Sequence, residues 1–124
     1  MILGIGTDLV EIERIRVALD RHGKRLIERV LGPDERDRLP ETNRPAWIAK
    51  RFATKEAVAK ALGTGFRDGL RLVDIQTRHD GNGRPEVVLG GRAREVLKRM
   101  GGGEISLSIS DERSYALAFV VISR

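Results

Sequence analysis

The strongest helix signal in the sequence lies at residues 46–62, and it limits the folds that the rest of the chain can form. This segment is rich in alanine and contains no glycine or proline. Alanine has the highest helix propensity, and the Gly63-Thr64-Gly65 run that follows is typical of a helix C-terminus. We therefore expect one long central helix with the shorter elements arranged around it.

Before this helix, residues 2–10 alternate as a strand does. One face of this strand carries the apolar residues Leu3, Ile5 and Leu9. The other face carries Gly4 and Gly6, followed by Asp8. Because glycine has no side chain, the two glycines leave space beside the carboxylate where a ligand or another backbone can come close.

The remaining segments predict short helices and antiparallel strands. Helices are predicted at residues 11–22, 24–31, 33–36 and 92–100, and a loop at 40–45. Strands are predicted at residues 72–77, 86–89, 104–110 and 115–122, the last almost wholly apolar and therefore central in its sheet. The Asp80-Gly81-Asn82-Gly83 run is a strong hairpin signal. This order predicts an α+β fold with a mainly antiparallel sheet, in a single domain covering residues 1–124.

Charge and composition restrict the partners of the chain without identifying one. The sequence has 23 basic and 18 acidic residues, a net charge of +5, which favours nucleic acid, phosphorylated cofactors or an acidic protein as partner. Its single Trp, single Tyr and three Phe residues are few for a surface that stacks nucleic-acid bases. With no cysteine, no apolar run that could span a bilayer and no basic leader, a soluble cytoplasmic protein is the simplest expectation.

Asp8 and Glu56 are the carboxylates whose surroundings indicate chemistry. Asp8 suits the N-cap of the next helix or a metal site, and the two roles are compatible. Glu56 lies among apolar or small neighbours, where a carboxylate is costly unless it is paired or bound to a metal. From the helix alone an ion pair with Lys60 is the simpler interpretation, and Arg51, Lys55 and Lys60 can equally form a solvated basic face. Two carboxylates near cations are also what a magnesium–pyrophosphate site requires, although spacing alone does not bring Asp8 and Glu56 together.

A second group of cations lies in the first helical region. Arg14, Arg21 and Arg25 share one face if the first helix continues past Gly23, and Lys24 widens the basic area. This face is either solvated or a docking strip that steers and orients an acidic helix.

Four segments, in order, resemble the sequence signatures of the holo-[acyl-carrier-protein] synthases. The first is Ile-Gly-Thr-Asp-Leu-Val-Glu-Ile at residues 5–12, and the second is Arg-Phe-Ala-Thr-Lys-Glu-Ala at 51–57, continuing to Gly65. Residues 82–85 and the serine-rich 106–110 with Tyr115-Ala116 complete a match that covers essentially the whole chain. Many family members have a histidine directly after the serine-rich strand, whereas this chain has Asp111.

The resemblance implies a 4′-phosphopantetheinyl transferase-like fold and a reaction. The phosphopantetheine arm of coenzyme A would be transferred to a serine of an acyl carrier protein, with release of adenosine 3′,5′-bisphosphate. Asp8 and Glu56 would hold Mg²⁺ with the coenzyme A pyrophosphate. Glu56 would take the serine proton directly or through a water, and Lys60 would support the leaving phosphate.

The resemblance also implies binding residues and an assembly. The implied coenzyme A contacts are Arg51, Lys60, Gly63, Gly65 and Pro85. The implied contacts with the acidic recognition helix of the carrier protein are Arg14, Arg21, Lys24 and Arg25. The family further implies a homotrimer with active sites between subunits, acting in fatty acid biosynthesis.

Two other functions remain as alternatives. A small nucleic-acid-binding module accounts for the net charge of +5 but leaves the Asp8 and Glu56 motifs unexplained. A related transferase that serves carrier domains of polyketide or peptide synthases is a closer alternative. Such relatives are typically longer and built from a repeated unit, so the compact length of this chain favours the fatty-acid type.

Overall fold

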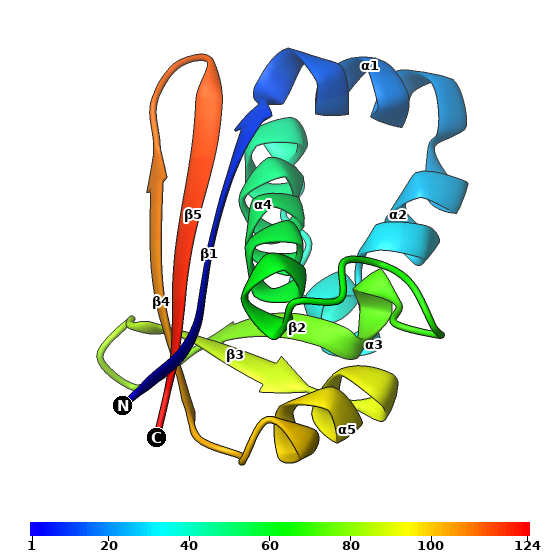
Figure 1. Ribbon diagram of the computed structural model, residues 1–124. Helices are drawn as coiled ribbons and strands as arrows, with labels where there is room; N and C mark the ends of the chain where they lie inside the picture. Colours follow the sequence, from blue (N-terminus) through cyan, green and yellow to red (C-terminus); the bar gives the residue numbers. More distant parts are fainter.

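The computed structural model describes all 124 residues, which form a sheet crossed by one long helix and flanked by shorter helices and a hairpin (Figure 1). The helices are α1 (Ile12–His22), α2 (Lys24–Val30), α3 (Pro33–Asp37), α4 (Arg44–Leu62) and α5 (Gly91–Arg99), with a 3-10 helix, η1, at Leu72–Asp74. The strands are β1 (Ile2–Glu11), β2 (Ile75–His79), β3 (Pro85–Leu89), β4 (Glu104–Asp111) and β5 (Tyr115–Ser123). The predicted α+β class with antiparallel pairing is confirmed.

The main sheet has the strand order β1-β5-β4, so the almost wholly apolar β5 is central, as predicted. Asp8 of β1 lies opposite Ala118 of β5, which sets the place of this carboxylate along the strand. β2 and β3 form a separate hairpin around the predicted turn. In that turn the Asp80 carboxylate accepts hydrogen bonds from the backbone N–H groups of Asn82 (2.8 Å) and Arg84 (2.9 Å).

Helix α4 covers one face of the main sheet. The β5 side chains that face it, Ala116, Ala118, Val120 and Ile122, are fully buried. Gly4 and Gly6 of β1 lie against the helix backbone, and a Cβ atom on Gly6 would lie only 2.9 Å from the Ala57 carbonyl carbon and from the Ala61 nitrogen. The space predicted on the glycine face of β1 is therefore filled by the backbone of α4.

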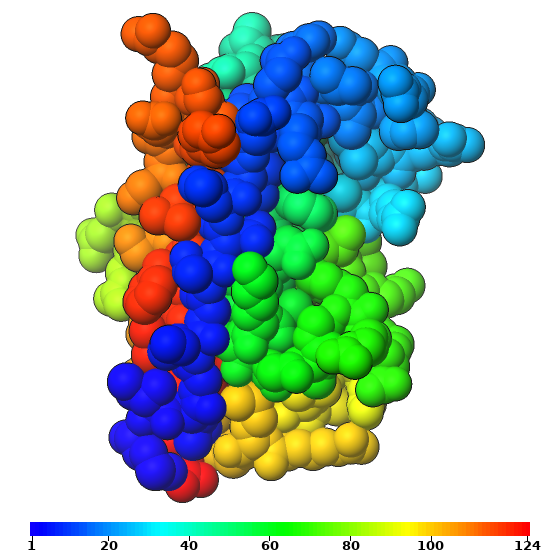
Figure 2. Space-filling view, turned by 45° about the horizontal axis from the view of Figure 1, so that its top comes forward, coloured from blue at the N-terminus to red at the C-terminus, as the bar shows by residue number.

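The opposite face of the main sheet has no covering layer. Its apolar side chains Ile5, Leu9, Leu117 and Phe119 are 60, 61, 40 and 46 % exposed. Figure 2 shows β1 (blue) running along the molecular surface between β5 (red) and green segments from α4 and the loop after it. The predicted alternation in residues 2–10 is present, with Ile5 and Leu9 pointing outward instead of into the core.

Three boundaries can be compared with the predicted ones. α4 begins at Arg44, inside the predicted loop, because Pro45 is favourable in the first turn of a helix. Residues 72–74 form the 3-10 helix η1, so the strand predicted from residue 72 begins at Ile75. α1 ends at Gly23, whose φ of 51° suits glycine and separates α1 from α2. None of the helices combines the length and the apolar character that crossing a membrane requires.

Candidate active site

Strand β1 and helix α4 bring Asp8 and Lys60 together. The Lys60 ammonium group donates hydrogen bonds to the Asp8 carboxylate (3.1 Å) and to the carbonyl oxygen of Thr7 (2.9 Å). Asp8 does not cap α1, whose N-cap residue is Glu11 and which has no side-chain cap hydrogen bond. The N-cap interpretation is wrong because β1 continues to Glu11 and keeps Asp8 inside the strand.

Glu56 lies close enough to Asp8 for the two carboxylates to interact. Both line one cavity, together with Phe52 of α4. Burial raises the pKa of Glu56, repulsion from Asp8 raises this pKa further, and Lys60 lowers it. The Glu56–Lys60 ion pair that helix spacing favours is absent, because Lys60 binds Asp8 instead. With two carboxylates and only one ammonium group, the site would be stabilised by a further cation.

The Asp8 and Glu56 carboxylates fit a magnesium ion whose coordination is completed by a substrate. Mg²⁺ prefers oxygen ligands and usually takes one or two protein carboxylates, with phosphate oxygens and water in the other positions. Asp8 and Glu56 supply such a pair. The chain has no cluster of three or more acidic, histidine or cysteine side chains that could hold a metal without help. The residues therefore suit an ion shared with phosphates.

A cavity of about 720 Å³ opens beside Glu56; most of its lining is apolar, and Glu28, Arg29 and Arg71 also line it. Its walls come from α2, α4 and the segment after α4, and include Leu26, Val30, Phe52, Phe66, Leu70 and Leu72. Leu26, Val30, Phe52 and Glu56 also line the cavity that contains Asp8. A charged group and an apolar chain can therefore bind side by side at this site.

Gly63 and Gly65 follow the site at the C-terminal end of α4. Gly63 has a φ of 81°, and its N–H donates to the Lys60 carbonyl oxygen (3.0 Å). Gly65 has a φ of 61°, and its N–H donates to the Ala59 carbonyl oxygen (3.3 Å). The predicted helix stop is confirmed, and it keeps both glycines close to Lys60 in the chain.

Arg51 lies on a different side of α4 from Glu56, since five positions at about 100° per residue leave the two about 140° apart around the helix. Its guanidinium group stacks on the Trp47 ring at 3.7 Å, and its buried Nε has no hydrogen-bond partner. Burial lowers the pKa of Arg51 to about 10; Glu35 opposes this shift and Arg38 adds to it. An unpartnered donor beside a second cation suits an anion.

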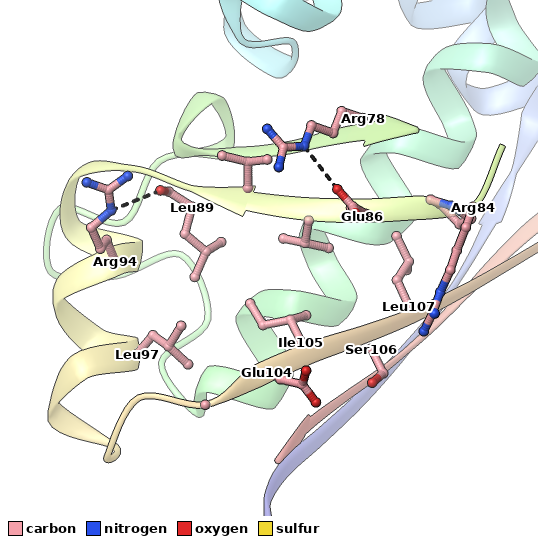
Figure 3. A pocket seen from close by; sticks show the side chains of 14 residues that line it. Arg78, Arg84, Glu86, Leu89, Arg94, Leu97, Glu104, Ile105, Ser106 and Leu107 are labelled. Carbon is pink, nitrogen blue, oxygen red and sulfur yellow. Dashed lines mark hydrogen bonds and ion pairs between the residues drawn. The ribbon is translucent and has the colours of Figure 1, made fainter. Parts of the chain in front are cut away.

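Pro85 lies on the same side of the molecule as Arg51. It pairs with His79, whose pKa is lowered by burial and then by Arg51. Pro85 and Arg84 also line a cavity of about 510 Å³ between β3 and β4 (Figure 3). In Figure 3 the Arg84 side chain extends toward Ser106 on β4. One chain thus carries the predicted coenzyme A contacts in two places, one around Glu56 and one around Arg51.

Lys55 is fully buried, so it is not part of a solvated basic face. Its ammonium group lies 2.6 Å from the carboxylate of Glu35, which is also fully buried. Of the three basic residues considered for that face, only Lys60 is well exposed. Sequence reasoning missed Glu35, whose carboxylate accepts the N–H of the α3 N-cap residue Gly32 (3.0 Å).

Arg14 and Arg21 line a shallow depression on α1. Arg14 also borders the cavity that contains Asp8. Val17 lies in the same depression, is 41 % exposed, and was missed by sequence reasoning. The sequence signal that could have found Val17 is its position three residues after Arg14 and four before Arg21, which places all three on one helix face. α1 therefore presents two arginines around one apolar side chain, in a depression that Glu11 and Glu13 also line.

Lys24 and Arg25 do not extend this face. The predicted break at Gly23 is confirmed and places them on α2, so the condition for one continuous basic face is not met. Lys24 lies 3.7 Å from Glu28, and an Arg25 guanidinium nitrogen lies 3.3 Å from His22 Nδ1. Of the four predicted docking residues, only Arg14 borders the cavity that contains Asp8.

Comparison with known proteins places this arrangement in a family. The 4′-phosphopantetheinyl transferase superfamily model matches residues 4–120. Holo-[acyl-carrier-protein] synthases of Acidithiobacillus ferrooxidans and Halorhodospira halophila are 51 % and 48 % identical, covering 100 % and 98 % of this chain and 98 % of each relative.

Solved structures agree. The holo-[acyl-carrier-protein] synthase of Neisseria meningitidis is 42 % identical with a TM-score of 0.92, covering 100 % of both chains. The Helicobacter pylori enzyme in complex with coenzyme A is 33 % identical with a TM-score of 0.84, covering 96 % of this chain and 99 % of that one. The chain therefore belongs to the 4′-phosphopantetheinyl transferase superfamily and, within it, to the holo-[acyl-carrier-protein] synthases.

Proposed function

We propose that this transferase moves the 4′-phosphopantetheine group of coenzyme A onto a serine of an apo acyl carrier protein and releases adenosine 3′,5′-bisphosphate. The observation that carries the proposal is the meeting of Asp8, Glu56 and Lys60 beside an apolar cavity. The coenzyme A complex of the Helicobacter pylori relative supports the choice of donor. We treat residues 1–124 as one transferase domain.

The geometry suggests a division of roles. Phosphoryl transfer depends mainly on positioning and on neutralising charge. Asp8 and Glu56 would hold Mg²⁺ against the coenzyme A pyrophosphate, where the ion would polarise the phosphate under attack. Glu56, directly or through a water, would take the proton of the carrier serine. Lys60 supports the leaving phosphate from its place beside Asp8.

The apolar cavity beside Glu56 suits the pantetheine arm. This arm is long and uncharged, and it must lie next to the phosphate that is attacked. The cavity shares Glu56 with the carboxylate site and is lined mainly by apolar side chains. We assign Gly63 and Gly65 to the same donor, because they lie at the end of α4 just beyond Lys60.

The other predicted coenzyme A contacts suit a second copy of the chain. Arg51 has an unpartnered buried Nε near another cation, which suits a phosphate of coenzyme A, and Pro85 lies on the same side. Within one chain this region and Glu56 lie on different sides of α4. We therefore propose that each active site combines the Glu56 region of one protomer with the Arg51 region of its neighbour.

The uncovered face of the main sheet supports such an assembly. Ile5, Leu9, Leu117 and Phe119 form an exposed apolar group on adjacent strands. Contiguous apolar patches of this kind mark interaction surfaces in soluble proteins. We propose that this face joins three copies into the homotrimer that the sequence resemblance implies.

The carrier protein would dock on α1. Arg14 and Arg21 can attract and orient an acidic helix, and Val17 offers an apolar contact between them. Arg14 also borders the Asp8 cavity, so a helix bound there would bring its neighbouring serine close to the site. Lys24 and Arg25 would contribute at the edge of the interface.

Service to secondary-metabolism carriers is a weaker alternative, because the relatives are named as acyl carrier protein synthases. A nucleic-acid-binding role is not favoured by any of them. Cytoplasmic location and a place in fatty acid biosynthesis stay predictions.

Intact-mass spectrometry of an apo carrier protein incubated with coenzyme A and Mg²⁺ tests the proposal. We expect a mass gain of one phosphopantetheine group that a chelator abolishes. Glu56→Gln should fold normally and lose most of the activity. Glu95→Gln, which removes an exposed carboxylate on α5, is the matched control and should stay active. Full activity of Glu56→Gln would refute the assigned role, and no transfer by the unmodified protein to several carriers would refute the function.

A further inference from the structure

The most deeply buried charge of the protein lies next to Glu56 in the chain but outside the site. The Lys55 side chain is fully buried, with its Nζ 2.6 Å from Glu35 Oε1. The same ammonium group donates to the carbonyl oxygens of Leu72 (3.0 Å) and Ile75. All three of its hydrogens therefore have acceptors.

The partner carboxylate is equally well satisfied. Glu35 accepts the N–H of Gly32 through Oε1 (3.0 Å) and the N–H of Thr77 through Oε2 (3.0 Å). The pair thus joins the start of α3, the middle of α4, η1 and β2. These segments are far apart in the sequence, and the contacts hold them through bonds of defined direction.

One of these segments forms the wall of the apolar cavity beside Glu56. Leu70, Leu72 and Val73 line that cavity. The segment has no strand partner, and the backbone hydrogen bonds donated by Leu70 and Asp74 go to nearby Arg67 and Arg71. The bond from Lys55 to Leu72 attaches the wall to α4, one residue before Glu56.

Stability alone does not explain a buried pair of charges. Removing two charges from water is costly, and well-packed apolar residues of similar volume often stabilise a fold equally or better. What apolar packing lacks is direction, because a hydrogen bond fixes both the distance and the orientation of the groups it joins. The pair therefore suits a task in which a wall must be held in one position.

We propose that Lys55 and Glu35 are positioning residues, which fix the wall formed by residues 70–73 relative to Glu56 so that the donor's arm binds in one orientation. The proposal rests on the transfer activity proposed above. It predicts that loss of the pair weakens coenzyme A binding beyond what the accompanying loss of stability explains.

Three variants separate positioning from stability. Lys55→Met removes the charge, Glu35→Gln keeps the size but removes the carboxylate, and Ile122→Ala is a control that opens a cavity under the main sheet. Each is assayed well below its own Tm. We expect the first two to raise the KM for coenzyme A by on the order of tenfold. Ile122→Ala should keep the KM for coenzyme A within about twofold of the unmodified protein's value, even if its Tm falls as much as the Tm of the two pair variants.

Hydrogen exchange of the unmodified protein provides a test that needs no variant. The Gly32 and Thr77 amides should be as well protected as those in the middle of α4. Exchange of these two amides at the rate of an exposed loop would overturn the proposal, as would an unchanged KM in both pair variants. If the unmodified protein transfers nothing, the proposed function fails, whereas hydrogen exchange and calorimetric titration with coenzyme A still decide the role of the pair.

Discussion

Replacing Gly6 with alanine tests whether the approach of β1 to α4 places the two carboxylates. The new Cβ would lie 2.9 Å from the Ala57 carbonyl carbon and from the Ala61 nitrogen, and closer still to the Ala57 carbonyl oxygen. Carbon atoms in contact are normally about 3.5 Å apart, so strand and helix must separate by at least ~0.6 Å. Overpacking costs about 1–3 kcal/mol, and we expect the upper part of that range because the opposing atoms belong to backbone.

This cost can be measured as a loss of stability and of activity. Urea unfolding followed by circular dichroism should show a loss of about 2–3 kcal/mol, and the Tm should fall by about 4 °C per kcal/mol. Asp8 lies two residues after Gly6, and Glu56 directly precedes Ala57, so separation also moves the carboxylates apart. Misplacement by about 1 Å can cost roughly 100-fold in rate, and we expect kcat/KM to fall at least tenfold.

Gly81→Ala is the matched control. No atom lies within 4 Å of a Cβ at Gly81, in the hairpin turn. This variant should keep full activity and gain at most about 0.4–1 kcal/mol, because alanine restricts the unfolded chain. If Gly6→Ala proves as stable and as active as Gly81→Ala, the argument from backbone approach is wrong.

Three further outcomes follow from the structure. Asp80→Asn should lower Tm more at neutral pH than near pH 3. Hydrogen bonds from the Arg84 and Asn82 backbone lower the pKa of Asp80, so this carboxylate stabilises the fold above its unfolded pKa of 3.8 and loses that contribution as pH falls through its folded pKa. Parallel curves of Tm against pH for the two proteins would contradict this. Arg14→Glu should raise the KM for the carrier protein about tenfold with a smaller effect on kcat, and a KM that does not change would remove α1 as the docking surface. Phe119→Asp should give a folded monomer, measured by light scattering, that has no transfer activity in the mass assay. An intact oligomer would exclude the uncovered sheet face as the interface.

Local signals in the sequence predicted most elements correctly. α4 was predicted from its alanine content and glycine stop, the hairpin from its turn, and the central place of β5 from its apolar character. Each of these signals lies within the element itself. The end of β1 was harder, because pairing with β5 extends the strand to Glu11 and prevents Asp8 from capping the next helix.

The errors concern contacts between residues far apart in the sequence. Helix spacing alone could not show that Lys60 forms its ion pair with Asp8 and not with Glu56, or that Lys55 is buried against Glu35. The glycine pattern in residues 2–10 correctly indicated a close approach. Only the structure identifies its partner as the backbone of α4.

The order of the strands has a consequence for how the chain folds. β1, which carries Asp8, pairs only with β5. It therefore leaves the ribosome long before the strand with which it pairs. Contacts of such long sequence separation pay a large loop-closure entropy and slow folding. In the interval the hydrogen-bonding edge of β1 remains without a partner, which favours aggregation. We therefore expect the register of β1, and with it the final position of Asp8 beside Glu56, to be fixed only when β5 has paired with it.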